Sequence, residues 1–277
     1  MVPTLKGANV ILYSYIIQIP APENRYLREA SAKPMKTIVL DFGNTSLKMG
    51  LFENKELIWT RREPMLSVDL LIENLSDYTF DAIVLASTGV PLSPYVQGLS
   101  ARWKTLEITN ATPVPVTVSY DTPSTLGVDR IAAAVAANEK YPNENTLVID
   151  CGTCITYELI QRGTYCGGAI SPGLKMRLSA MNHFTERLPL IEQFEEKTIW
   201  PGKSTNESML AGAIRGWELE IKGFIDQQRH QSDQLNVILT GGDAHRFEST
   251  EKMGIFADPF HVLRGLNEIF GYNADSL

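Results

Sequence analysis

Two short segments of the sequence place an aspartate directly after an apolar run and follow it with glycine and polar residues. The first is Asp41-Phe42-Gly43-Asn44-Thr45, and the second is Asp150-Cys151-Gly152-Thr153. Glycine lets the backbone approach an oxyanion closely, and Asn and Thr side chains add hydrogen-bond donors. One such segment alone is more simply an Asx-type turn between strands, but two copies favour a pair of facing phosphate loops.

The first segment has further parts that suit a nucleotide. Lys48, on the strand that follows, offers a positive charge, and the Asp41 carboxylate can hold a divalent ion directly or through water. A third loop, Thr240-Gly241-Gly242-Asp243, also ends an apolar strand. Its glycine pair leaves room for a flat ring against the main chain, so an adenosine pocket is reasonable there, although the loop alone is a common strand-to-helix turn.

A candidate base lies between these loops in Gly127-Val128-Asp129-Arg130, directly before an alanine-rich helix. A helix N-terminus stabilises an ionised carboxylate, which suits a group that must accept a proton at pH 7. The alternative is an aspartate that serves only its own helix, with Arg130 on a solvated face. Spacing alone favours that alternative.

Two other motifs resemble known sites and are rejected. Gly202-Lys203-Ser204-Thr205 resembles the end of a P-loop, but Lys197 stands where the first glycine of that motif is required. Cys151 and Cys154 form a C-x-x-C pair, yet no second pair or paired histidine motif accompanies them. Small buried side chains are the better interpretation of both cysteines.

Composition narrows the class of protein. A chain of 277 residues with 44% hydrophobic and 21% charged residues can bury one large core or two medium ones. A net charge of -7 and an isoelectric point near 5.2 argue against nucleic-acid and membrane partners and favour a small-molecule substrate. Three cysteines do not make a disulfide framework and are typical of a reducing cytoplasm.

The first 34 residues differ from the rest, and we expect Met35 to begin the folded domain, with residues 1–34 as an appendage of uncertain status. The apolar run Val10 to Ile19 is about half the length of a membrane span, and as a signal peptide it lacks a strong basic start and a good cleavage site.

Hydrophobic periodicity predicts the same order of elements twice. Antiparallel meanders are expected at 37–59 and 146–170, strands at 82–86 and 236–239, and helices at 68–75, 131–140, 206–228 and 262–270, the last ending at Gly271. Ser171-Pro172-Gly173 is expected to start a further helix, with Pro near its first position. A turn at 142–145 marks the predicted boundary between half-domains 35–145 and 146–277.

Taken in order, these motifs resemble the type III pantothenate kinases, and the resemblance runs from about Met35 to the C-terminus. Besides the segments above, it includes Gly167-Gly168-Ala169-Ile170-Ser171-Pro172-Gly173-Leu174. The resemblance implies an α/β fold, the duplicated RNase H-like fold of actin-like ATPases, sugar kinases and Hsp70, with the active site in the cleft. It implies ATP-dependent phosphorylation of pantothenate, the first step of coenzyme A biosynthesis, by a cytoplasmic homodimer.

The resemblance also implies roles for individual residues. Asp129 is the expected proton acceptor, and Asp150 the expected ligand of a monovalent cation, K⁺ or NH₄⁺. ATP with Mg²⁺ is expected to bind at Asp41, Phe42, Gly43, Asn44, Thr45, Ser46, Leu47, Lys48 and Thr153. Pantothenate is expected at Tyr120, Gly127, Val128, Asp129, Arg130 and Thr205, near a subunit interface.

The sequence departs from the family pattern in a few places. Cys154 replaces the usual Ala, and Ser46 stands where many members carry Arg, which leaves Lys48 as the main cation of its loop. Two alternatives stay open: another small-molecule kinase of the superfamily, and a regulator like the Bvg accessory factors. Retention of three placed aspartates speaks against a purely binding role, and the acidic charge speaks against DNA contact.

Overall fold

The computed structural model describes residues 34–194, 200–232, 234–247 and 253–274. Residues 1–33 of the predicted appendage therefore lie outside the described residues. Met35–Leu277 form one compact unit. No helix of the described residues is long and apolar enough to cross a membrane.

The first sheet has five strands in the order β3-β2-β1-β4-β5. An antiparallel meander forms one side, and two strands parallel to β1 complete it. The meander comprises β1 (Lys36–Phe42), β2 (Leu47–Glu53) and β3 (Glu56–Glu63), and the parallel strands are β4 (Ala82–Ser87) and β5 (Lys104–Glu107). Helices α1 (Val68–Ser76) and α2 (Ser93–Ser100) connect the last three strands.

The second sheet repeats this order as β9-β8-β7-β10-β11 and adds β6 beside β9. Its strands are β6 (Thr117–Val118), β7 (Asn145–Cys151), β8 (Cys154–Gln161), β9 (Thr164–Pro172), β10 (Asn236–Thr240) and β11 (Phe256–Ala257). Its helices are α4 (Leu174–His183) and α5 (Thr205–Gln231), and short 3₁₀ turns cover Pro123–Thr125 and Ala244–Arg246. The repeat confirms the duplicated fold expected from the paired aspartate segments.

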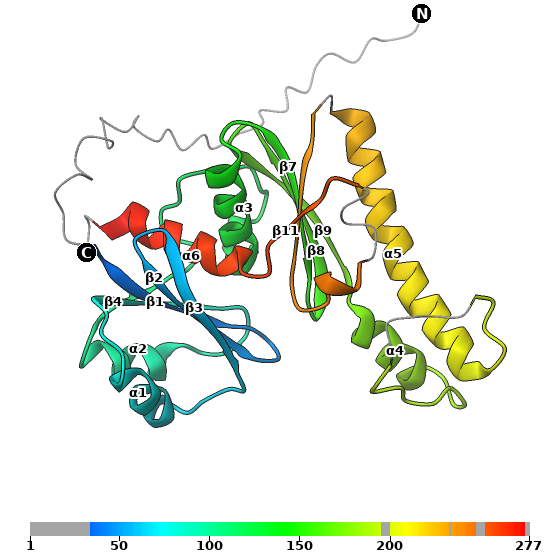
Figure 1. The fold of residues 1–277 in the computed structure, drawn as a ribbon, viewed down its shortest axis with the longest axis horizontal. Coiled ribbons are helices and arrows are strands. Elements are labelled where there is room, and N and C mark those ends of the chain that lie inside the picture. The colour runs from blue at the N-terminus through cyan, green and yellow to red at the C-terminus, as the bar shows by residue number, and fades with distance from the viewer. Residues whose placement is uncertain (1–33, 195–199, 233, 248–252, 275–277) are drawn as a thin grey trace, which may run out of the picture. The chain divides into compact units, whose positions relative to one another are not determined.

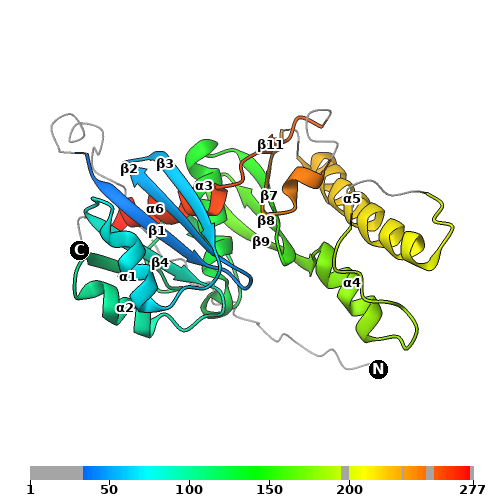
Figure 2. The ribbon, with the colours of Figure 1, turned by 60° about the horizontal axis from the view of Figure 1, so that its bottom comes forward.

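Each half ends in a helix that packs between the sheets, α3 (Val128–Lys140) and α6 (His261–Asn273). Figures 1 and 2 show both helices between the sheets, with α1 and α2 outside the first sheet and α5 outside the second. Alternation along the strands explains these layers, because Val39 and Val148 join the core around α3 and α6 while Leu40 and Ile149 join the outer cores. Asp41 and Asp150, each two residues after a Val of that core, therefore share the inner face of their strands.

The predicted elements are largely confirmed, with two corrections. Pro172 does not start a helix, because it ends β9 and α4 begins at Leu174 after Gly173. The last helix does not stop at Gly271 but continues to Asn273. Strand β6 precedes residue 145 yet pairs in the second sheet, and the division into 35–145 and 146–277 stays a prediction.

Candidate active site

The first aspartate segment forms the tip of the β1–β2 hairpin. The backbone N–H of Gly43 donates to the Ser46 carbonyl at 3.2 Å, which closes the turn. Phe42 and Leu47 bury their side chains in the outer core, so only their backbone groups can reach a ligand. Asn44 and Thr45 are exposed at the tip. The hairpin therefore presents the Asn44 and Thr45 side chains at its tip, and its role as a phosphate loop stays a prediction.

Asp41 and Lys48 face each other across this hairpin. The Lys48 ammonium lies 3.5 Å from the Asp41 carboxylate, which is buried. Burial raises the pKa of Asp41 above its ordinary value, despite the opposing effect of Lys48. Burial lowers the pKa of Lys48, but the negative charges of Asp41 and Asp150 outweigh it and the pKa is raised overall. Lys48 is thus held as a cation beside the phosphate loop.

The second aspartate segment forms the β7–β8 hairpin and touches the first. The hydroxyl oxygens of Thr45 and Thr153 lie 3.0 Å apart. The Asp150 carboxylate lies against the third loop: a β-carbon on Gly241, whose φ is +96°, would come within 2.3 Å of it. Asp243 N–H also donates to the Cys151 carbonyl at 2.9 Å. All three predicted loops therefore meet at one place.

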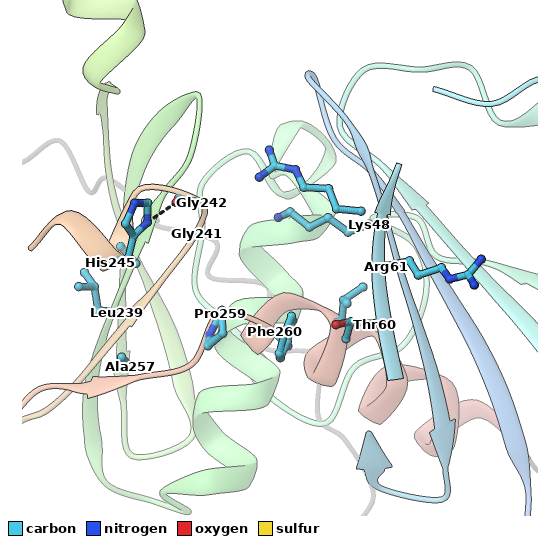
Figure 3. Close-up of a pocket in the computed structure, with 13 residues that line it drawn as sticks. Lys48, Thr60, Arg61, Leu239, Gly241, Gly242, His245, Ala257, Pro259 and Phe260 are labelled. Atoms are coloured by element: carbon cyan, nitrogen blue, oxygen red, sulfur yellow. Dashed lines mark hydrogen bonds between the residues drawn. The ribbon is translucent and has the colours of Figure 1, made fainter. Parts of the chain in front are cut away.

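A pocket of about 400 Å³ opens beside the third loop. Figure 3 shows Lys48 and Thr60 on one wall and Gly241, Gly242 and His245 on the other. His245 Nδ1 lies 2.8 Å from the Gly242 carbonyl. Pro259, Phe260, Leu239, Ala257 and Leu263 add apolar surface. A largely apolar pocket with two glycines has room for a flat ring, and the adenosine pocket that the sequence suggested stays a prediction.

Asp129 lies in the first turn of α3, after Gly127 at the N-cap. Its carboxylate accepts the backbone N–H of Arg130 at 2.9 Å. Burial, followed by the negative charges of Asp41 and Asp150, raises its pKa to about 6. This differs from the expectation that the helix N-terminus would dominate, yet the group stays mostly ionised at pH 7. A carboxylate with such a pKa suits a general base.

Arg130 is buried in a polar network between α3 and the second sheet. Its Nε donates to Glu158 at 2.8 Å, and the Tyr165 hydroxyl donates to the other Glu158 oxygen at 2.7 Å. Its guanidinium also lies 5.8 Å from the Tyr120 ring centre. Arg130 Nη2 is buried and finds no hydrogen-bond partner among the described residues. The alternative that Arg130 lies on a solvated face is therefore wrong, because its side chain is buried.

Thr205 is not brought to the other predicted residues within one chain. It begins α5, where the Ser204 hydroxyl accepts the Glu207 N–H as a helix cap. That this segment is no P-loop rests on the sequence, where Lys197 stands in place of the first glycine of the motif. Thr205 lines an open pocket of about 660 Å³ with Met181, Leu188, Gly202, Lys203, Ser204, Ser208 and Met209. Figures 1 and 2 show the start of α5 far from α3.

The fit to metal ions follows from the carboxylates. Within the described ranges, no group of three or more Asp, Glu, His or Cys residues is placed to hold an ion. Asp41 and Asp150 offer separate carboxylates beside the phosphate loops, which suits an ion held largely by phosphate oxygens and water. Cys151 is buried and its thiol pKa is raised well above the ordinary value because burial disfavours the thiolate, so it suits packing better than chemistry.

Two residues of the site were missed from the sequence. Arg62 on β3 donates from Nε to the Ser46 hydroxyl at 2.8 Å and lines the pocket, but none of the motifs read from the sequence includes it. Glu158 is fully buried beside Arg130. A single acid on the inner face of an apolar strand was the signal that could have identified Glu158, because such a residue needs a buried cation.

Solved structures share the fold at low sequence identity. A protein from Campylobacter jejuni assigned to the Baf family of transcriptional activators matches with a TM-score of 0.59 and 20% identity, covering 86% of this chain and 99% of that one. The activator of 2-hydroxyisocaproyl-CoA dehydratase from Clostridium difficile, with bound ADPNP, matches with a TM-score of 0.51 and 14% identity, covering 87% and 95%. The chain thus has the fold of the actin-like ATPases and sugar kinases.

Sequence relatives are much closer. Type III pantothenate kinase from Phocaeicola vulgatus is 42% identical over 239 residues, which are 85% of this chain and 98% of that protein. The same enzyme from Cytophaga hutchinsonii is 36% identical, covering 85% and 99%. A model of the type III pantothenate kinase family matches residues 37–227. The chain therefore belongs to the type III pantothenate kinase family and is a kinase that uses ATP.

Proposed function

We propose that this kinase transfers the terminal phosphoryl group of ATP to the primary hydroxyl of pantothenate, the first step toward coenzyme A. The observation that supports this most directly is Asp129, a carboxylate with a pKa of about 6 next to two joined phosphate loops. The names of the relatives supply the identity of the acceptor. A cytoplasmic location stays a prediction from the cysteine content.

Asp129 acts as the base in this proposal. With a pKa of about 6 it is ionised in about nine tenths of molecules at pH 7, so it can orient the hydroxyl and take its proton as the phosphoryl group arrives. Asp41 and Asp150 assist indirectly, because their negative charges help keep the pKa of Asp129 near 6. A base whose pKa lies just below the working pH is mostly unprotonated, and it is still basic enough to accept a proton from the substrate.

The substrate lies between Asp129 and the Arg130 network. The buried Nη2 of Arg130 lacks a partner among the described residues, and an unpaired buried donor costs free energy. An acceptor oxygen of pantothenate, such as its carboxylate, satisfies this donor. Glu158 and Tyr165 hold the guanidinium in place from the other side. Tyr120 covers it, with Gly127 and Val128 forming the adjoining helix start.

The phosphate side works by position and charge. Phosphoryl transfer has a loose transition state, so most of the catalysis comes from alignment and neutralisation. Lys48, the loop N–H groups and the hydroxyls of Thr45 and Thr153 supply these contacts from both halves of the cleft. Mg²⁺, when bound to the ATP phosphates within reach of Asp41, supplies additional positive charge. Asp150 is the residue we assign to a monovalent cation.

We also propose a homodimer in which Thr205 serves the pantothenate site of the partner subunit. Within one chain Thr205 lies at the far end of α5 from the α3 site. Large apolar side chains are exposed around this end of the molecule, including Phe184 at 82% and Trp200 at 68%. Large apolar side chains left exposed at one end of a chain are candidates for burial against a partner subunit.

An ADP-release assay tests the activity. Purified protein is given ATP with pantothenate, hexoses or acetate, each with and without K⁺ or NH₄⁺. Of the three kinds of acceptor, we expect only pantothenate to give ADP. Either cation should raise this rate in the wild type, and neither should change it in Asp150→Asn. A hexose or acetate as the preferred acceptor would assign the protein to another branch of the superfamily. DNA binding at physiological salt without ATP turnover would favour the regulator instead.

A further inference from the structure

Arg62 extends a row of charged residues across the first sheet. Asp41 on β1 pairs in register with Lys48 on β2, and Lys48 pairs with Arg62 on β3. Residues directly opposite in an antiparallel sheet point to the same face, so all three side chains lie on the inner face of the sheet. The row consists of one negative charge, on Asp41, followed by two positive charges, on Lys48 and Arg62. It ends at the pocket beside Gly242.

The two cations of this row are unequally paired. Lys48 has the Asp41 carboxylate at 3.5 Å. Arg62 donates to the neutral Ser46 hydroxyl, and it makes no ion pair with a carboxylate in the described ranges. Like charges directly across a strand pair repel each other, which costs stability. A bound anion would turn this repulsion into attraction for both side chains.

The Arg62 guanidinium also reaches from the first half of the cleft to the second. A β-carbon on Gly242 would lie 3.2 Å from Arg62 Nη1. Arg62 is therefore fixed at one end by the phosphate loop, through Ser46, and its other end lies against the glycine pair of the pocket. An ATP molecule that places its ring in this pocket and its terminal phosphate near Asp129 must run past this guanidinium.

We propose that Arg62 binds the diphosphate part of ATP, the part that ADP keeps. This assignment rests on the proposed use of ATP at the cleft. The transferred phosphate must lie near Asp129, whose charged neighbours are Asp41 and Asp150. Arg62 is two strands away from Asp41, or about 10 Å at the usual strand spacing. It is thus placed for the phosphates that stay with the nucleotide, with Lys48 nearer the one that leaves.

Arg61 is the matched control for this proposal. It is the adjacent arginine of the same strand, but its guanidinium lies over Trp59 and Tyr78, 5.7 Å from each ring centre. Figure 3 shows the Arg61 side chain directed away from Lys48 and Gly242. Arg61 also contributes to the lining of the pocket, but its guanidinium does not lie against Gly242. Arg61→Ala therefore removes the same charge from the same strand and leaves the Arg62 guanidinium in place.

The test is calorimetric binding of ATP, ADP and adenosine to wild type, Arg62→Ala, Arg62→Lys and Arg61→Ala, with no pantothenate present. We expect Arg62→Ala to weaken ATP and ADP equally, by about 10- to 100-fold, because a charge-assisted hydrogen bond is lost. Adenosine affinity should not change. Arg62→Lys should recover only part of the loss, since lysine cannot donate in a fork. Arg61→Ala should bind all three ligands as wild type does.

Steady-state kinetics and thermal unfolding complete the test. Arg62→Ala should raise the KM for ATP while the KM for pantothenate changes by less than about twofold, as expected for loss of uniform binding. Its unfolding temperature should equal or exceed that of wild type, because a like-charge pair is removed. The assignment would be contradicted if Arg62→Ala weakened adenosine binding as much as ATP binding. It would also be contradicted if the loss of affinity were confined to ATP, or if Arg62→Ala bound all three ligands as wild type does. If the wild type binds ATP but does not phosphorylate pantothenate, the proposed function is wrong, while the assignment of Arg62 to the diphosphate of ATP is not affected.

Discussion

The side-chain oxygens of Thr45 and Thr153 lie 3.0 Å apart, although 108 positions separate these residues in the chain. Among the described residues, this is the only side-chain hydrogen bond that directly joins the β1–β2 hairpin to the β7–β8 hairpin. Because each hairpin belongs to a different sheet, this contact joins the two halves of the duplicated fold at the place where the phosphates of ATP are proposed to lie.

Replacing Thr153 with valine tests this contact. Thr153→Val keeps the side-chain shape but removes the hydroxyl, so both the bond to Thr45 and one donor to ATP are lost. We expect the KM for ATP to rise about three- to tenfold, the usual scale for one neutral hydrogen bond. Thr164→Val, the same chemical change at the start of β9, is the control and should leave the KM unchanged. Equal effects of the two variants would contradict a role for the Thr153 hydroxyl.

The rate should depend on pH through Asp129. Its pKa is raised to about 6, and the base must be ionised to accept a proton. At saturating ATP, kcat/KM for pantothenate should therefore be level above pH 7 and fall about tenfold per unit below pH 6. Circular dichroism at each pH controls for unfolding. A profile that stays flat down to pH 5 would show that the base has a lower pKa or is another group.

Mixed dimers test the placement of Thr205. Asp129→Asn and Thr205→Ala each should be weakly active as homodimers. If Thr205 serves the partner's site, a dimer of one Asp129→Asn and one Thr205→Ala subunit contains one intact site and should recover about half of the wild-type rate. Dimers carrying both changes on one subunit and none on the other should show no intact site. The reverse pattern would place Thr205 in the site of its own chain.

The motifs were accessible from the sequence because they depend on local rules. An apolar strand that ends in Asp-x-Gly, as at Asp41 and Asp150, predicts a hairpin tip, and its repetition predicts the duplicated fold. The role of Arg62 depends instead on the register of three strands, which sets it opposite Lys48. The helix start at Pro172 failed for a similar reason, since pairing with Cys154 keeps that proline in β9.

The Arg130 network shows the same limit. The sequence places Arg130 next to a helix start, where an exposed side chain is the simplest expectation. Its burial depends on Glu158, which is 28 positions away on β8. The pKa of Asp129 was also inaccessible, because burial and the distant carboxylates of Asp41 and Asp150 outweigh the local effect of the helix.

Asp129 should cost the protein stability, and this gives a control for its removal. Its folded pKa of about 6 lies above the ordinary value of 3.8, so the folded state binds the proton more tightly than the unfolded state does. The stabilisation that the protonated Asp129 gives at low pH is therefore lost as pH rises from about 4 to 6. At pH 7, Asp129→Asn should raise the free energy of unfolding by about 1 to 3 kcal/mol. A large loss of stability in urea unfolding would contradict the pKa assignment.

The most direct test of the central claim is the rate of pantothenate-dependent ADP formation by Asp129→Asn at pH 7. Asparagine keeps the size and the hydrogen bond to the Arg130 N–H but cannot accept the substrate proton. We predict a folded protein that binds ATP normally and turns over about 10²- to 10⁴-fold more slowly than wild type. A folded variant with a rate near wild type would show that Asp129 is not the base.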